Sequence, residues 1–194
     1  MDGRIMKGGF AQMLIQGYTA PRLSARQILA SGGGLQLALM MVALTYLVHA
    51  IFSLLLKSEG GGIGGHLIAI IQQIIIFFLL SGLVYGIGRM AGGTGTILGA
   101  QLVVAWHALV TSVISPLAIG ISAAMFRAQE SGAIPSGVLL LGVVYVAISF
   151  WLMANYVAEL HGFRSAASVL GAIIGLTFAF AFMLAIIVSL ITSA

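Results

Sequence analysis

Residues 169–191 read VLGAIIGLTFAFAFMLAIIVSLI, a run without a single Asp, Glu, Lys or Arg. An α-helix needs about 20 predominantly apolar residues to cross the hydrocarbon core of a bilayer. In lipid, only helices and closed barrels pair every backbone N–H and C=O group, and this run lacks the alternation of a barrel strand. The stretch therefore predicts a transmembrane α-helix.

Four further apolar runs precede it, and we expect each to be a membrane-spanning helix. They cover residues 35–56, 67–87, 97–119 and 138–158. The third stays uncharged as far as residue 126, which is longer than one untilted span, and it contains Pro116. Proline lacks the N–H that a helix interior needs, so we expect a kink at Pro116 and an exit from the membrane between residues 119 and 126. The sequence thus predicts an all-α, polytopic integral membrane bundle of about five transmembrane helices over residues 35–194.

The composition supports this prediction and excludes several classes of protein. Of the 194 residues, 61% are hydrophobic and 6% are charged, against roughly 25% charged residues in soluble domains. The chain has no cysteine, which excludes disulfides, thiol catalysis and iron–sulfur clusters. The net charge of +4 is spread along the chain, so it indicates membrane topology and no nucleic-acid binding. The lipid bilayer is the first expected partner.

Basic residues are divided unevenly between the two expected sides of the membrane. With the N-terminus inside, the inner segments carry Arg4, Lys7, Arg22, Arg26, Arg89 and Arg164, and the outer segments carry Lys57 and Arg127. Segments rich in Lys and Arg stay in the cytoplasm. This six-to-two distribution predicts a cytoplasmic N-terminus and, with five crossings, a C-terminus outside.

Residues 1–34 precede the first span, and we expect them to form a cytoplasmic, interfacial segment with short helices. Phe10, Met13 and Leu14 recur at helical spacing. After Pro21, Ser24 and Gln27 have the spacing of a capping box at the start of a second helix. We interpret the segment as two short helices on the inner membrane surface; the alternative is an unstructured tail.

The ionisable residues offer few candidates for chemistry inside the membrane. All four acids lie outside the spans or at their edges: Asp2, Glu59, Glu130 and Glu159. Two histidines lie within spans, His49 about 21 Å from the start of the first and His107 about 15 Å from the start of the third. They could face each other if these helices touch. With Trp106 they form a candidate intramembrane polar site, and the alternative is two neutral imidazoles hydrogen-bonded across helices.

No catalytic residue, cofactor site or metal site is indicated. Two histidines without further ligands are too few to indicate a metal. The glycines at 92–95 are not followed by the Lys-Ser/Thr of a phosphate-binding loop. Small residues four apart, such as Gly171 and Gly175, predict close helix contacts and a tight bundle.

One charged cluster lies on the predicted inner face. Glu159, His161 and Arg164 precede the last span, and Arg22 and Arg26 lie in the N-terminal segment. These five residues form a candidate inner-face contact site. The alternative is a solvated turn whose arginine only sets topology.

The layout resembles the Yip family of Ypt/Rab-interacting membrane proteins, in its bacterial branch. Pro21 lies before a short amphipathic helix, Pro116 late in the third span and Trp151 in the fourth. Gly92-Gly93-Thr94-Gly95-Thr96 separates the second and third spans, and Glu159-Leu160-His161-Gly162-Phe163-Arg164-Ser165-Ala166-Ala167 leads into the last. The resemblance implies a five-helix bundle with a cytoplasmic N-terminus. The chain lacks the long N-terminal region and the Asp-Leu-Tyr-Gly-Pro motif of eukaryotic relatives, which argues against binding of Rab-type GTPases.

Three functional hypotheses follow. The first is a non-enzymatic protein of a bacterial inner membrane that organises membrane or recruits partners, among them other membrane proteins or further copies of itself. The second is a small transporter or channel that uses His49, His107 and the kink at Pro116. The third is an enzyme acting on lipid, with His107 and a nearby serine as its minimal site.

Overall fold

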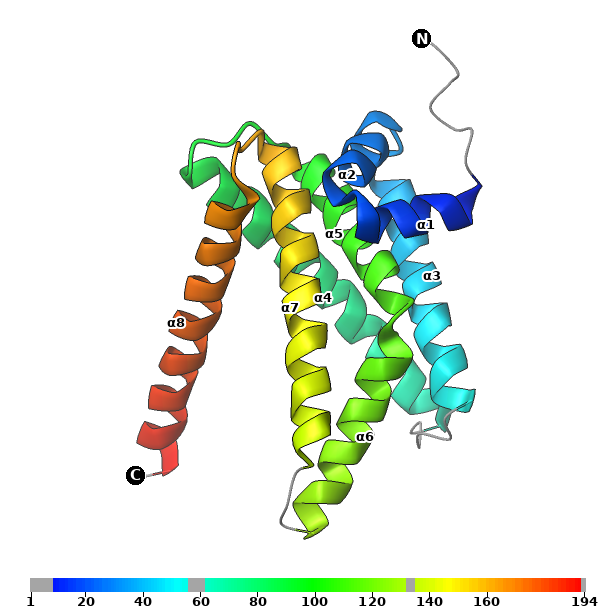
Figure 1. Cartoon of the computed structure of the whole chain (residues 1–194), viewed down its shortest axis with the longest axis vertical. Helices are drawn as coiled ribbons and strands as arrows, with labels where there is room; N and C mark the ends of the chain where they lie inside the picture. Colours follow the sequence, from blue (N-terminus) through cyan, green and yellow to red (C-terminus); the bar gives the residue numbers. More distant parts are fainter. Residues whose placement is uncertain (1–8, 56–61, 132–134, 193–194) are drawn as a thin grey trace.

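The computed structural model describes residues 9–55, 62–131 and 135–192. These residues form eight α-helices and no β-strand (Figure 1), which confirms the all-α prediction. The helices are α1 (Phe10–Thr19), α2 (Pro21–Ala30), α3 (Gly34–Leu55), α4 (Gly62–Met90), α5 (Ile97–Ser112), α6 (Ser115–Ser131), α7 (Ser136–His161) and α8 (Ala166–Thr192).

Four of these helices, α3, α4, α7 and α8, are each long and apolar enough to cross a membrane. Counting α5 and α6 as one broken span brings the crossings in the described residues to five. Large apolar side chains point outward along the long helices, and Phe178 and Ile191 of α8 are 73% and 71% exposed. Apolar surface on this scale needs lipid to cover it. The chain is an integral membrane protein.

The third span is broken at the predicted place. α5 ends at Ser112, α6 begins at Ser115, and the two helices meet at 68°. Pro116 lies in the first turn of α6, where its missing N–H removes no helical bond. Its ring excludes a continuous helix through the preceding turn. The kink expected at Pro116 is confirmed.

Three helices, α4, α7 and α8, run longer than the apolar runs that predict them. α4 begins at Gly62, so residues 62–66, which lie before the predicted span of 67–87, are helical. α7 continues to His161 and ends at Gly162, whose φ of 71° is left-handed. An apolar run indicates only the part of a helix that lies in the hydrocarbon core of the bilayer. The helix itself continues beyond that run until a residue such as glycine ends it.

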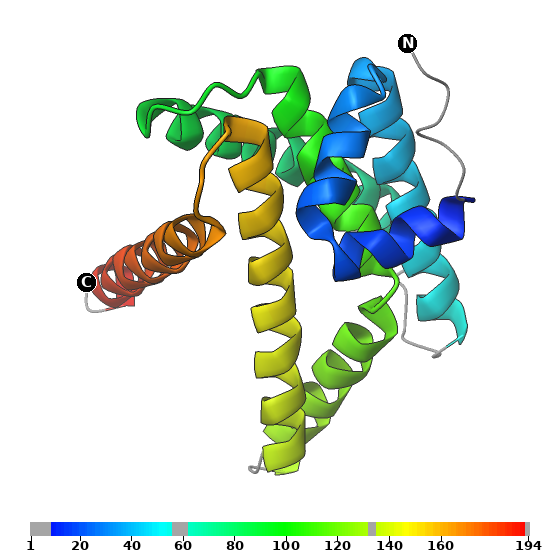
Figure 2. The same cartoon turned by 45° about the horizontal axis from the view of Figure 1, so that its top comes forward.

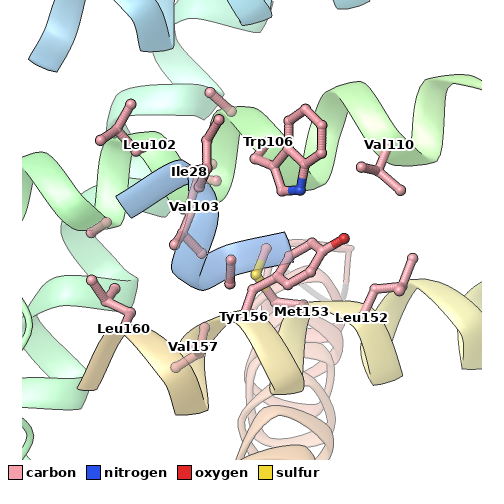
Figure 3. Packing of buried hydrophobic residues seen from close by; sticks show 14 of the residues in the cluster. Ile28, Leu102, Val103, Trp106, Val110, Leu152, Met153, Tyr156, Val157 and Leu160 are labelled. Carbon is pink, nitrogen blue, oxygen red and sulfur yellow. The ribbon is translucent and has the colours of Figure 1, made fainter. Parts of the chain in front are cut away.

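The core is centred on α5, which packs against α3, α4, α7 and the N-terminal helices. Ala100, Val103 and Val110 of α5 are fully buried. Figure 3 shows Trp106 of α5 in this cluster with Tyr156 of α7 and Ile28 of α2. One short helix outside the spans therefore contributes directly to the core.

Aromatic side chains fasten α1 and α2 to the bundle. Tyr156 donates a hydrogen bond to the Gly17 carbonyl at 3.0 Å, and Tyr18 donates to the Val110 carbonyl at 2.5 Å. Burial raises the pKa of Tyr18 to about 12, so its phenol keeps its proton at neutral pH. Trp106 Nε1 donates to the Ser24 hydroxyl at 2.7 Å. The two predicted N-terminal helices exist, and they are packed onto the spans.

The predicted capping box at Ser24 is wrong. α2 begins at Pro21, so Ser24 lies inside the helix and its hydroxyl faces the core, 1% exposed. Pro21 starts the helix because its fixed φ suits the first helical position. The Ser24 hydroxyl is used to accept the indole proton of Trp106 instead.

Candidate functional site

His107 on α5 is hydrogen-bonded to α7. Its Nε2 lies 3.1 Å from the Ser149 carbonyl oxygen and 3.3 Å from the Ser149 hydroxyl. A carbonyl can only accept, so Nε2 carries a proton and donates it to this bond. The His107 ring also meets the Tyr156 ring edge-on, with centroids 6.1 Å apart. These contacts make His107 a link between two packed helices.

The three candidate intramembrane residues do not form one site. α3 and α5 pack together, yet in the described part of the chain no hydrogen bond or ring contact joins His49 to His107. Trp106 precedes His107 on α5, and consecutive helical residues point about 100° apart. Trp106 accordingly faces α2. None of the three lines the apolar groove between α4, α7 and α8 or the shallow pocket at residues 32–40.

The pair of His107 and Ser149 lacks the geometry of a hydrolase. A catalytic histidine accepts the serine proton at the nitrogen nearest the hydroxyl and is oriented by a third group at the other nitrogen. Here the nearest nitrogen, Nε2, already donates to a carbonyl. No hydrogen bond among the described residues joins Nδ1 to a carboxylate. The arrangement holds helices together.

A second group of polar residues lies at one end of the bundle. We call this region the platform, and it consists of α2, residues 89–96 from the end of α4 to the start of α5, and residues 159–167 from the end of α7 to the start of α8. The platform lies at the top of Figure 1, at the opposite end of the molecule from the C-terminus. It contains both segments that carry the family resemblance.

Glu159 near the end of α7 joins this helix to α2. Its carboxylate lies 2.7 Å from Arg26 Nε and 3.6 Å from Arg22 Nε. The bond to Glu159 raises the pKa of Arg26 above its ordinary value. Arg22 also donates to the carbonyls of Phe163 and, at 3.2 Å, Arg164. Four of the five residues predicted for the inner-face contact site are therefore brought together.

The fifth, His161, does not face outward as the predicted contact site requires. It is 2% exposed, and its Nε2 donates to the Val84 carbonyl of α4 at 3.1 Å. Its Nδ1 accepts from the Gly95 N–H at 3.3 Å. Its ring stacks on Phe163 with centroids 5.5 Å apart. Both ring nitrogens are used inside the protein, so His161 holds the fold.

Glycines make the space for the His161 ring. A Cβ added at Gly88 would overlap the ring, and Cβ atoms at Gly93 and Gly95 would come within 2.5 Å and 2.8 Å of it. Thr94 N–H then donates to the His161 carbonyl at 3.2 Å. The glycine-rich loop before α5 and the His-Gly-Phe segment after α7 are therefore two halves of one contact.

The outer surface of the platform is basic. Arg26, Arg89 and Arg164 are exposed and Arg22 is partly exposed, whereas Glu159 is largely covered. Arg89 Nη1 donates to the Gly93 carbonyl at 3.1 Å, which holds its side chain over the glycine loop. The four guanidinium groups outnumber the one carboxylate among these residues and leave net positive charge on this face.

Beside the platform lies an apolar groove of about 690 Å³ between α4, α7 and α8. α8 packs on α7 near the platform and diverges from it further along, as both Figure 1 and Figure 2 show. The lining residues are Leu80, Leu83, Val84, Ile87, Gly88, Ala91, Met153, Val157, Phe163, Arg164, Ser165, Ser168, Val169, Ala172, Ile173, Leu176, Thr177 and Phe180. Sequence reasoning missed this groove, because its apolar lining has the same composition as the lipid-facing surface.

Comparisons with known proteins place the chain in a family. No curated protein and no solved structure matches it. The family model of the Yip1 domain matches residues 15–188, which cover most of the chain. The match includes α2, the glycine loop and the segment around His161, which the structure joins into the platform. The chain belongs to the Yip1 domain family of membrane proteins.

Proposed function

We propose that the protein is a non-enzymatic membrane organiser that recruits partners through its platform. The observation that carries the proposal is the basic outer surface of the platform, held in a fixed shape by the contacts of Glu159 and His161. Such a surface suits a partner with an acidic cytoplasmic face, because opposite charges favour encounter and set orientation.

The proposal places the platform and the N-terminus in the cytoplasm of a bacterium, with the protein in its inner membrane and the C-terminus outside. The six-to-two distribution of basic residues supports this orientation. The expected partners are other membrane proteins or further copies of the chain, and the missing Asp-Leu-Tyr-Gly-Pro motif argues against Rab-type GTPases.

The contacts of the buried polar residues favour this proposal over a transporter or an enzyme. A transport site needs polar groups that face a cavity or the substrate. His107 instead bonds to Ser149 on a packed helix, and Trp106 bonds to Ser24. The contact site that we propose consists of Arg22, Arg26, Glu159 and Arg164.

Replacing Arg26 with glutamate should reduce the recovery of partners. Arg26 is 69% exposed and Glu159 is its ion-pair partner, so reversing its charge changes the platform surface with little effect on packing. We expect proteins that co-purify with the wild type from native membranes to fall by about fivefold or more in Arg26→Glu. Quantitative mass spectrometry after purification in mild detergent measures the change.

Arg26→Lys is the matched control, because it keeps the charge and should keep the partners. Surface ion pairs add little to stability, so the thermal unfolding temperature of both variants should stay close to that of the wild type. Equal recovery with Arg26→Glu and the wild type, or no protein above a mock purification, would refute recruitment through the platform.

A further inference from the structure

The groove between α4, α7 and α8 has one polar end. Arg164, Ser165 and Ser168 line it where α8 begins, next to the platform. The rest of the lining is apolar apart from one threonine, and no carboxylate is part of it. Arg164 is exposed, and in the described part of the chain its side chain forms no ion pair. Among the described residues that line the groove, Arg164 is therefore a cation without an ion-pair partner, and it lies above an apolar channel.

The length of the groove matches one leaflet of a bilayer. Its lining on α8 runs from Ser168 to Phe180, which is about 18 Å along a helix. Half of the hydrocarbon core of a bilayer is about 15 Å thick. A groove that starts at the platform therefore reaches approximately the middle of the membrane, which is the depth of one acyl chain.

We propose that this groove binds one anionic phospholipid from the leaflet at the platform. The lipid phosphate pairs with Arg164 and accepts hydrogen bonds from Ser165 and Ser168, while an acyl chain lies between α8 and α4. The amino-terminal end of α8 begins at Ala166 and adds its positive dipole to the same place. The charge of Arg164, unpaired by any lining acid, gives the preference for an anionic headgroup.

A lipid suits the groove better than an extended peptide. The walls below Arg164 are apolar, so peptide N–H and C=O groups would lack hydrogen-bond partners there, at a cost of several kcal/mol each in a membrane. The groove also adjoins the lipid-facing surface of α8, where Leu176 is 48% exposed. An acyl chain can enter sideways from the bilayer. The volume of about 690 Å³ is in the range of ordinary ligand sites.

Native mass spectrometry of the purified protein tests the proposal with two vesicle-forming lipids of equal chain length. Phosphatidylglycerol should be retained as a one-to-one complex in preference to the zwitterionic phosphatidylcholine. Ala172→Phe fills the middle of the groove and should lower the retained fraction of both lipids about tenfold. Arg164→Gln should abolish the preference between them, because it removes the positive charge that distinguishes a net anionic headgroup from a zwitterionic one.

Ala181→Phe is the matched control for the groove variant. Residue 181 is exposed on α8 and lies about two and a half turns from Ala172, hence on the opposite face of the helix. It should bind lipid as the wild type does, and inorganic phosphate should displace no lipid from either protein. Circular dichroism confirms that each variant is folded.

Three results would overturn the proposal. One is equal retention of the two lipids by the wild type. Another is unchanged retention by Ala172→Phe. The third is a lipid-free dimer that Ala172→Phe disrupts, which would make a second copy the occupant. Ala172→Phe leaves all four residues of the proposed contact site unchanged, and the readout is retained lipid rather than co-purified protein. Failure of the lipid proposal is therefore distinguishable from failure of partner recruitment by the platform.

Discussion

Replacement of Trp106 with alanine is expected to lower the free energy of unfolding by about 3 kcal/mol or more. The Trp106 side chain is 1% exposed at the centre of the core, where α5 meets α2 and α7 (Figure 3). Removing the indole leaves a cavity and takes away the hydrogen bond to Ser24. In a membrane, helices associate through close packing, so a cavity weakens the bundle directly. Unfolding of the purified protein in mixed micelles by increasing SDS measures the loss.

Trp151→Ala is the matched control, because Trp151 is 44% exposed on the lipid-facing side of α7. Its loss should change the free energy of unfolding by less than about 1 kcal/mol. Similar decreases in the free energy of unfolding in the two variants would show that the burial of Trp106 does not explain its contribution to stability. Limited proteolysis should also cleave near α2 more readily in Trp106→Ala, since α2 loses the hydrogen bond of Ser24 and its packing against the indole.

Replacement of Gly88 with alanine is expected to destabilise the protein by about 2 kcal/mol, although alanine favours helices. An added methyl group at Gly88 would overlap the His161 ring, whose Nε2 is fixed on the Val84 carbonyl. Gly93 and Gly95 also lie against the ring, and Phe163 stacks on it, so the ring has little room to move away. SDS titration gives the stability, and the exposure of His161 to diethyl pyrocarbonate should rise.

Gly86→Ala is the control one half-turn away on the same helix. A methyl group at Gly86 meets nothing within 4 Å, so this change should be neutral or stabilise α4 by up to about 1 kcal/mol. The double variant Gly88→Ala with His161→Ala should be no less stable than His161→Ala alone, because the ring that the methyl group overlaps is gone. Additive losses in the double variant would disprove the overlap.

Much of the candidate site cannot be predicted from the sequence, because it depends on which face of each helix packs inward. Apolar residues surround α4 and α8 on all sides, so no polar stripe indicates which face of either helix packs inward. His161 was predicted at a surface because it follows Glu159, yet the helix turn between them points their side chains in different directions. The two motifs around Gly93 and His161 lie far apart in the sequence, and nothing in their spacing joins them.

The sequence by itself determined that the chain crosses the membrane as about five helices and breaks at Pro116. These features follow from local chemistry. In lipid, each span must form its backbone hydrogen bonds within its own helix. Proline has no N–H to donate, so the helix is interrupted there. Only the tertiary structure decided that His161 is enclosed by glycines, that Trp106 faces Ser24 and that α8 leaves a groove beside α4. These depend on the rotation of each helix about its axis, which packing between distant segments sets.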